Sequence, residues 1–348
     1  MQIAVFVFNE QGEAIAERLV SGLDYQVLID RNMDETQKDL PFKERVARLW
    51  DQVDGFIFVA ATGIVVRTIA PLLKGKTVDP AVLVIDAAGR YVISLLSGHL
   101  GGANRLTKEV AGVLGAVPVI TTATDVLGKT SVEDWANELG LKVVNPEGLV
   151  KINGALVRDV TITVYTELPV ADLAKHPLNP GKTLFKPLER LSLSPPQGPS
   201  LAVTRQQFGV DRVDLELVAP SLVVGIGCRR GTGKEVIKQF IQETFREKGW
   251  PLAAVTSIVS VEQKKDEEGL LALARELKVP VRFFKPEELQ AVLEAMPQLE
   301  KSLFVEEKIG VGAVCEPAAI LGSQWGQLPV GKRSYRGVTI AVARVASP

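Results

Sequence analysis

Short runs of apolar and β-branched residues alternate with helical segments along most of this sequence, and this alternation constrains the fold more than any other feature. Residues 2–8, 25–29 and 55–60 have the pattern of buried strands, and amphipathic helical patterns lie between them. A strand that is covered by helices on both faces is continuously apolar, as in parallel sheets with helical crossovers. The sequence therefore predicts an α/β architecture.

A change in pattern near the middle divides the 348 residues into three predicted parts. Residues 1–128 form an N-terminal α/β domain and residues 220–348 form a C-terminal α/β domain, both with mostly parallel sheets. Residues 129–219 form a smaller α+β region that joins them. The passage 177–199 in this region is rich in proline, so we expect an irregular loop or a linker there.

Composition excludes several classes of protein. The chain has 40 Lys and Arg against 41 Asp and Glu, so we expect neither a nucleic-acid partner nor a membrane-surface partner. Its two Cys and two His do not provide the closely spaced ligand pairs of a zinc cluster. The N-terminus, MQIAVFVF, enters a strand pattern directly, with no targeting signal, and we expect a cytoplasmic protein.

Thr62, Gly63 and Arg67 follow the predicted strand 55–60 and open a helical pattern. Free N–H groups and the positive end of the helix dipole make such a turn suitable for an anion. The Thr62 hydroxyl would donate to the anion, and Arg67 would pair with a carboxylate. The alternative is a plain helix start with a solvated arginine.

A second strand-to-helix connection is richer in chemically versatile residues. Its candidate site residues are Ser97, Gly98, His99, Gly101, Gly102, Asn104 and Arg105. The glycines allow unusual backbone angles and the close approach of a ligand, and histidine suits proton transfer near neutral pH. We favour a functional loop over a tight turn with an ordinary surface histidine, because binding and catalytic residues concentrate on loops. Residues 121–125 mark a further loop after the next strand.

A third glycine-rich connection precedes a long helical pattern. Its candidate site residues are Gly227, Cys228, Arg229, Arg230, Gly231 and Thr232. A dinucleotide fingerprint would need glycine at position 230, and a Walker A loop would need glycine at 228 and Ser or Thr at 235. Paired arginines beside glycines instead favour carboxylates. The alternatives are surface ion pairs for the arginines and a small buried side chain for the cysteine.

Two further ionisable residues have distinctive surroundings in the sequence. Glu316, in VCEPAA, stands beside a predicted helix start. It would be an acid or base in a dry site, or it would simply complement the helix dipole. His176 falls in the proline-rich passage and is interpreted as a solvated loop histidine.

Five segments resemble one protein family in the order in which they occur: FVAATGIVVRTIAPLL, SLLSGHLGGANRLT, GIGCRRGT, VCEPAAIL and GVTIAVAR. They are similar to the cobalt-precorrin-5A hydrolase (CbiG) family of anaerobic cobalamin biosynthesis. The similarity runs over nearly the whole chain, and SGHLGGAN together with GCRRGT is a specific pair of motifs. The resemblance implies an N-terminal domain, a variable middle and a C-terminal domain related to a stand-alone protein of the cobalamin pathway.

The resemblance also implies a reaction. Water opens the ring-A δ-lactone of a cobalt-containing tetrapyrrole, cobalt-precorrin-5A, and the methyl-bearing meso carbon then leaves as acetaldehyde to give cobalt-precorrin-5B. The cobalt arrives with the substrate, so we expect no metal or cofactor bound by the protein. The expected partner is this tetrapyrrole. A homodimer is expected only from the frequency of symmetric dimers, and contacts with other cobalamin-pathway enzymes are a further expectation.

These expectations give the candidate residues roles. His99 is the base for the attacking water, Ser97 and the amides of Gly101 and Gly102 donate to the oxyanion, and Glu316 is a second proton-transfer candidate. The arginines expected to clamp the carboxylates around the macrocycle are Arg67, Arg105, Arg229 and Arg230. Two alternatives stay open: a non-catalytic corrinoid carrier or scaffold, and a P-loop-like nucleotide-binding enzyme built on residues 225–234.

Overall fold

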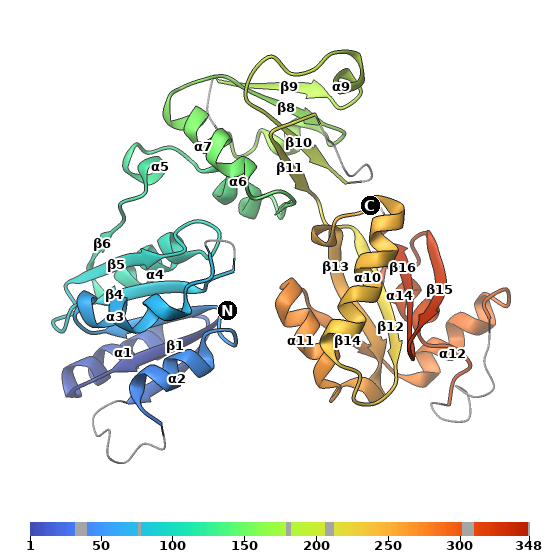
Figure 1. Cartoon of the computed structure of the whole chain (residues 1–348), viewed down its shortest axis with the longest axis horizontal. Helices are drawn as coiled ribbons and strands as arrows, with labels where there is room; N and C mark the ends of the chain where they lie inside the picture. Colours follow the sequence, from blue (N-terminus) through green and yellow to red (C-terminus); the bar gives the residue numbers. More distant parts are fainter. Residues whose placement is uncertain (32–39, 76–77, 179–181, 206–211, 301–309, 347–348) are drawn as a thin grey trace. The chain divides into compact units, whose positions relative to one another are not determined.

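Three β-sheets covered by helices make up the protein (Figure 1). A computed structural model describes residues 1–31, 40–75, 78–178, 182–205, 212–300 and 310–346. The chain divides into two compact units. The first unit, which contains the first sheet, consists of Met1–Trp135, Asn153–Val160 and Pro177–Gly181. The second unit contains the other two sheets and consists of Ala136–Ile152, Thr161–His176 and Lys182–Pro348. The predicted α/β class with mostly parallel sheets is confirmed.

The first sheet has six strands in the order β2-β1-β3-β4-β5-β6. Their bounds are β1 Gln2–Val7, β2 Gln26–Arg31, β3 Gly55–Val59, β4 Ala81–Ile85, β5 Tyr91–Leu96 and β6 Val117–Val119. Strands β1 to β4 are mutually parallel, whereas β5 runs antiparallel to β4 and parallel to β6. This one reversal decides at which edge of the sheet each following loop lies.

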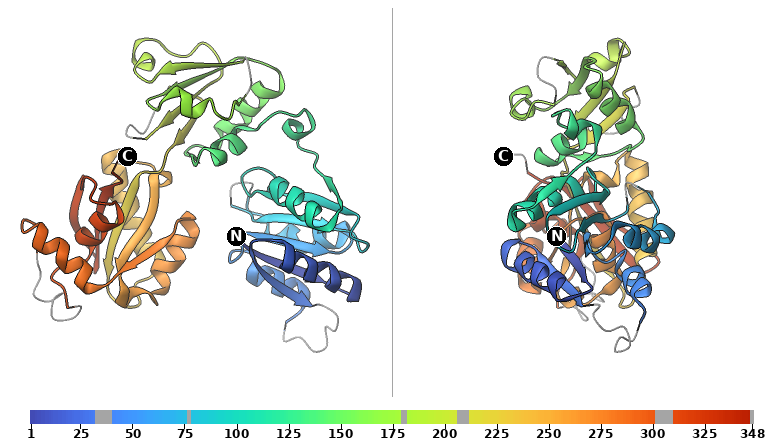
Figure 2. Two further views of the ribbon diagram at one scale, coloured as in Figure 1. Left: turned by 180° about the vertical axis from the view of Figure 1, so that it is seen from behind. Right: turned by 90° about the vertical axis from the view of Figure 1, so that its left-hand side faces the viewer.

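Alternate residues of the central strands pack against different helices, as the strand period of two requires. Ile3 and Val5 of β1 lie in a core with α1 (Glu10–Gly22) and α4 (Ala103–Leu114). Ala4 and Phe6 lie in a second core with α2 (Phe42–Leu49) and α3 (Thr62–Ile69). The helices therefore cover both faces of the sheet, which explains the continuous apolar runs in its strands (Figure 2).

The second sheet has the order β7-β11-β10-β8-β9. Its strands are β7 Lys142–Val143, β8 Ile162–Thr166, β9 Thr183–Pro187, β10 Ser200–Thr204 and β11 Leu215–Val218, and only β7 is antiparallel to its neighbour. The helices along this stretch of the chain are α6 Val132–Glu138, α7 Gly148–Val157, α8 Val170–Leu173 and α9 Arg190–Leu193. The residues of α6 up to Trp135 and those of α7 from Asn153 belong to the first unit. The expected irregular loop at 177–199 is wrong in part, because β9 and α9 lie within it; residues 179–181 are outside the described residues.

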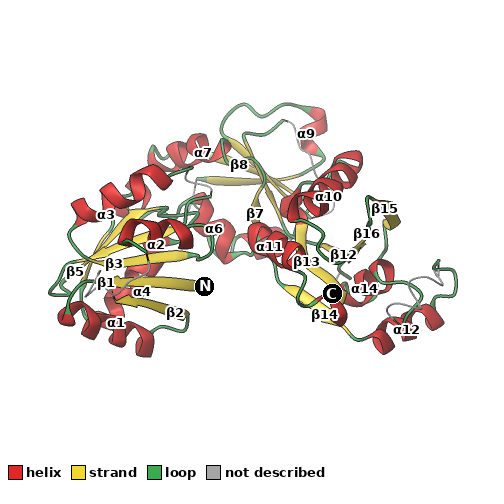
Figure 3. Cartoon of the chain, turned by 60° about the horizontal axis from the view of Figure 1, so that its bottom comes forward, coloured by secondary structure: helices red, strands yellow, loops and turns green. Residues whose placement is uncertain are grey.

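The third sheet has the order β14-β13-β12-β16-β15. Its strands are β12 Leu222–Cys228, β13 Val255–Val261, β14 Val281–Phe284, β15 Val330–Tyr335 and β16 Val338–Arg344. Helices α10 (Lys234–Lys248) and α11 (Glu268–Leu277) pack on one face, and α12 (Pro286–Ala295) and α14 (Cys315–Gly322) on the other (Figure 3). Within the described ranges, no helix is long and apolar enough to cross a bilayer.

Candidate functional site

The loop of residues 97–102 lies at the edge of the first sheet where β5 and β6 end. Because β5 is antiparallel to β4, its carboxyl end lies beside Ala81, where β4 begins. The loop after β6 leads into the short helix α5 (Ala123–Val126) at the same edge, since β5 and β6 are parallel. Neighbouring parallel strands thus deliver two loops to one place, which is where ligands bind in open α/β sheets.

Local sterics fix the shape of this loop. Ser97 has a positive φ of 59°, and its hydroxyl donates to the Asp79 carbonyl at 3.0 Å. A Cβ at Gly101 would lie 2.4 Å from the Cβ of Ser97, so only glycine fits there. Gly102 (φ 81°) precedes α4 and donates its N–H to the His99 carbonyl at 3.0 Å. The backbone on both sides of the histidine is therefore tightly held.

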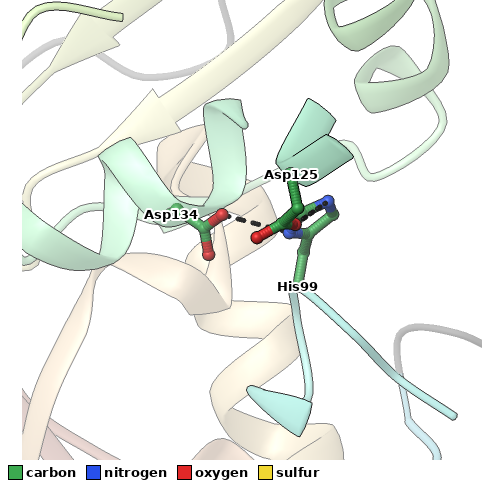
Figure 4. A group of neighbouring side chains, drawn as sticks. All are labelled: His99, Asp125 and Asp134. Atoms are coloured by element: carbon green, nitrogen blue, oxygen red, sulfur yellow. Dashed lines mark ion pairs between the residues drawn. The ribbon is translucent and has the colours of Figure 1, made fainter. Parts of the chain in front are cut away.

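The side chain of His99 is only 12% exposed and is bonded at both ring nitrogens. Nδ1 lies 3.1 Å from Asp134 Oδ2 and 3.2 Å from Ser131 Oγ. Nε2 lies 3.0 Å from Thr124 Oγ1 and 3.9 Å from Asp125 Oδ2. Figure 4 shows the ion pairs that join the His99 ring to the carboxylates of Asp125, from α5, and Asp134, from α6.

The surroundings of His99 favour its protonated form. Burial acts to lower the pKa of His99, but the hydrogen bond to Asp134 and the charges of Asp134, Glu133 and Asp125 outweigh burial, and the pKa is raised. Burial likewise acts to raise the pKa of Asp134, but hydrogen bonds from His99 and Ser131 lower it. The two groups stabilise each other's charged states, which makes His99 a stronger base than a free histidine.

Asn104 holds Asp125 in position beside the ring. It is 4% exposed, and its Nδ2 donates to Asp125 Oδ2 at 2.9 Å and to Thr122 Oγ1 at 2.7 Å. Its Oδ1 accepts from the Ser94 hydroxyl at 2.7 Å. The other oxygen of Asp125 accepts from Lys108 Nζ at 3.1 Å. The sequence candidate Asn104 therefore acts on the site through Asp125.

The same three side chains have the spacing of a possible cation site. His99, Asp125 and Asp134 each place one ligand atom within 4.8 Å of the others. However, Lys108 and Asn104 already use both oxygens of Asp125, and the ammonium group supplies the positive charge that a cation would bring.

Thr62, Gly63 and Arg67 lie at the opposite edge of this sheet from His99. Helix α3 begins at Thr62 directly after β3, which is parallel to β4 and therefore runs against β5. The guanidinium of Arg67 donates to the Gly63 carbonyl at 3.1 Å and not, among the described residues, to a carboxylate. The structure does not bring these three residues together with the loop 97–102. Arg105, in the first turn of α4, does lie at the His99 edge, and its side chain is 66% exposed.

The third glycine-rich connection, in the second unit, is occupied by a carboxylate of the protein itself. The Gly231 N–H donates to Glu267 Oε1 at 2.6 Å. Glu267 is 4% exposed and its other oxygen lies 3.3 Å from Lys264 Nζ. The Thr232 hydroxyl donates to the Arg229 carbonyl at 2.7 Å. The Gly231 amide is thus already paired with an internal carboxylate.

The remaining candidates of this connection make their contacts with other residues of the protein itself. Arg230 forms an exposed ion pair with Asp266. Burial raises the pKa of the Cys228 thiol, which fits a half-buried structural side chain. The Gly227 carbonyl accepts from the Thr339 hydroxyl at 3.2 Å and so belongs to the packing of β12 on β16.

Glu316 is a buried acid in the first turn of α14. It is 6% exposed, and its Oε1 accepts from the Lys332 N–H at 3.0 Å. Its Oε2 has no hydrogen-bond partner among the described residues. Glu316 also lines a cavity of about 460 Å³ in the second unit, together with Lys248 and Arg333. The neighbouring Cys315 is equally buried, which raises the pKa of its thiol to about 11.

Comparison with known proteins shows to which family the chain belongs. Residues 44–125 match "Cobalamin synthesis G N-terminal", residues 130–176 match "CbiG-like, linker domain", and residues 222–343 match "Cobalamin synthesis G C-terminus". A Salmonella typhimurium protein named cobalt-precorrin-5A hydrolase is 36% identical over 350 residues, covering 98% of this chain and 97% of that protein. The chain belongs to the CbiG family.

Further relatives of this CbiG chain are found among characterised proteins and solved structures. A Priestia megaterium protein, also named cobalt-precorrin-5A hydrolase, is 32% identical over 357 residues, covering 98% of this chain and 94% of that protein. A cobalamin biosynthesis protein G homologue of known structure from Sulfolobus solfataricus is 26% identical, with a TM-score of 0.41, and covers 99% of this chain and 97% of its own.

The histidine site joins two CbiG segments of the sequence. His99 and Asp125 lie in the N-terminal segment, whereas Ser131 and Asp134 lie in the linker segment. Sequence reasoning identified His99 but missed Thr124, Ser131 and Asp134. One signal was available, because Ser131 and Asp134 have the Ser-x-x-Asp spacing of a helix start, and Ser131 Oγ does accept from the Asp134 N–H at 3.1 Å.

Proposed function

We propose that this chain is a cobalt-precorrin-5A hydrolase, which opens the ring-A δ-lactone of its substrate with water and releases acetaldehyde to give cobalt-precorrin-5B. Two relatives that carry this name align with the chain over more than nine tenths of their length. The substrate brings its own cobalt, so the proposal requires no metal or cofactor from the protein. A cytoplasmic location, a homodimer and contacts with other enzymes of the pathway belong to the same proposal.

One observation carries the catalytic part of the proposal: the buried ring of His99 has a carboxylate at one nitrogen and a hydroxyl at the other. Lactone hydrolysis needs a base to remove a proton and donors for the developing oxyanion. We assign the base to His99, which Asp134 orients. Glu316 stays a second candidate for proton transfer.

Two of the predicted oxyanion donors already form hydrogen bonds within the protein. The Gly102 amide is bonded to the His99 carbonyl, and the Ser97 hydroxyl is bonded to the Asp79 carbonyl. Among the donors predicted in this loop, we therefore assign the Gly101 amide to the oxyanion. Arg105, exposed at the same edge, is assigned to a carboxylate at the rim of the tetrapyrrole. Arg229 and Arg230 stay candidates for carboxylates in the second unit.

The test is to incubate the purified full chain with cobalt-precorrin-5A and to measure acetaldehyde together with binding of the tetrapyrrole. A hydrolase releases one acetaldehyde for each macrocycle converted. A carrier or scaffold would bind the tetrapyrrole, seen as a change in its visible absorption, without releasing acetaldehyde. That second result would contradict the proposed function.

A further inference from the structure

Thr124, His99 and Asp134 form a continuous line from hydroxyl to imidazole to carboxylate. Thr124 Oγ1 lies 3.0 Å from His99 Nε2, and Asp134 Oδ2 lies 3.1 Å from His99 Nδ1. We propose that Thr124 is the nucleophile that attacks the lactone carbonyl, with His99 as its base and Asp134 as the residue that positions the ring. This inference rests on the proposed function. It also changes the identity of the group that His99 deprotonates first, from water to a side-chain hydroxyl.

The hydrogen-bond pattern determines which ring nitrogen carries the proton in neutral His99. The Ser131 hydroxyl donates its only hydrogen to Asp134 Oδ2 at 2.7 Å, so toward Nδ1 its oxygen can only accept. The ionised Asp134 carboxylate can also only accept. Both neighbours of Nδ1 therefore require an N–H there. The lone pair of the neutral ring is left on Nε2, facing the Thr124 hydroxyl, which is the arrangement of an activated nucleophile.

Charges on three elements act on the ring as it accepts the proton. Asp134 and Glu133 belong to α6, Asp125 belongs to α5, and Lys108 of α4 faces Asp125. The three carboxylates favour the imidazolium that forms during attack, while the lysine moderates their field. The pKa of His99 is accordingly raised, and the neutral ring that can act as a base becomes more abundant as the pH rises through this pKa.

The bonds of the proposed step balance. Thr124 Oγ1 attacks the acyl carbon, and its proton passes to His99 Nε2. The lactone C–O bond then breaks, and the same proton goes to the departing alkoxy oxygen, which leaves an ester between the acyl group and Thr124. Water attacks this ester, gives its proton to His99, and that proton returns to the threonine oxygen as the carboxylic acid leaves. The sum is one lactone and one water giving one hydroxy acid.

The surface around Thr124 suits a macrocycle with apolar faces and charged edges. Thr124 itself is 4% exposed, but Val126 and Leu127, which follow it in the chain, are 68% and 52% exposed. Arg105 lies at the same edge with an exposed guanidinium. These exposed apolar side chains of the same segment can contact the ring face, and the arginine can bind a peripheral carboxylate.

The experiment compares two threonine variants in the full chain with cobalt-precorrin-5A. Thr124→Val has nearly the same shape but no hydroxyl, and we expect acetaldehyde release to fall by about 10²-fold or more with unchanged binding of the tetrapyrrole. Thr124→Ser restores the hydroxyl and should retain activity. Thr121→Val is the matched control, because Thr121 is exposed in the same segment. Its activity should equal that of the wild type.

Covalent chemistry provides the second readout. The Thr124→Cys protein is quenched with acid during turnover, and its intact mass is measured. The spectrum should show a species with the mass of the protein plus one substrate molecule. Hydroxylamine should remove this adduct, because it cleaves thioesters. If Thr124→Val releases acetaldehyde at the wild-type rate, the assignment of Thr124 as the nucleophile is overturned, whereas the proposed hydrolase function is not. If Thr124→Val does not fold, a Thr124→Cys protein that turns over without an adduct has the same consequence. A wild type that binds substrate but releases no acetaldehyde would overturn the proposed function instead.

Discussion

At the scale of single residues, Asn104 is a buried side chain that holds Asp125 in position. It is almost fully buried and makes three side-chain hydrogen bonds, to Ser94, Thr122 and Asp125. Asn104→Ala leaves these buried groups unpaired, so we expect the free energy of unfolding to fall by about 2 kcal/mol. Urea denaturation measures this. The exposed Asn137, changed to alanine, should have an effect near zero, and equal effects of the two substitutions would contradict the positioning role.

The residue type of His99 was enough to select it from the sequence, but its partners could not be selected in the same way. Asp134 and Ser131 lie more than 30 positions further along the chain, in a segment whose pattern only indicates a helix. Which carboxylate meets the imidazole depends on how α6 returns to the edge of the first sheet. This pairing is determined by tertiary packing, so it could not be predicted from the single sequence.

At the scale of elements, the turn before α4 depends on a glycine with no space for a side chain. A Cβ at Gly101 would meet Ser97 Cβ at 2.4 Å, so Gly101→Ala must displace the loop that carries His99. We expect lower thermal stability and lower activity. Gly112, inside α4, has nothing within 4 Å of such a Cβ. Gly112→Ala should therefore raise the free energy of unfolding by up to about 1 kcal/mol. Calorimetry of both variants measures their stabilities. A Gly112→Ala protein that is less stable than the wild type, beside a Gly101→Ala protein that is not, would contradict this expectation.

The antiparallel pair β4 and β5 explains why the three predicted arginine turns do not all converge. The turns were predicted from their own residues, but the edge of the sheet at which each of them lies was not. Only Asp86–Arg90 separates the strands, and a parallel crossover needs a dozen or more residues. The short connection, closed by the Asp86 side chain on the Arg90 and Tyr91 amides, was therefore a readable signal of a hairpin.

At the scale of the whole molecule, the His99–Asp134 pair makes the stability of the chain depend on pH. His99 has a raised pKa, so its contribution is complete below its ordinary pKa of 6.5 and is lost as the pH rises through the raised value. Asp134 has a lowered pKa, so its contribution is present above 3.8 and is lost as the pH falls through the lowered value. Both contributions are complete between pH 3.8 and pH 6.5, so the pair stabilises the chain most in this range.

Asp134→Asn tests this dependence. The unfolding temperature of the wild type should exceed that of the variant most at about pH 5.5, and the difference should shrink as the pH rises through the raised pKa of His99. Differential scanning calorimetry across this range measures it. The matched control is Asp51→Asn, because Asp51 forms an exposed pair with Lys74 in the same unit and should give a small difference at every pH. A constant difference for Asp134→Asn would contradict a pH-dependent pair.

The general plan of the molecule could be predicted because apolar periodicity survives in a single sequence. Strands such as β1 and β3, buried on both faces, were predicted nearly at their bounds. The edge strand β15, whose sequence VGKRSY is polar, and the strand β9 inside the proline-rich passage were missed. Both have little apolar pattern of their own, and they are strands because neighbours in their sheets supply the hydrogen bonds.

The most direct test of the account is the rate of acetaldehyde release from cobalt-precorrin-5A by the full chain in which each histidine is replaced in turn. We predict that His99→Gln still binds the tetrapyrrole but loses activity by about 10²-fold or more, because Nε2 of His99 is the ring nitrogen that faces the Thr124 hydroxyl and is assigned as its base. His176→Gln, at the exposed pair with Glu138, should leave the rate unchanged. Undiminished release by a folded His99→Gln protein would contradict the account.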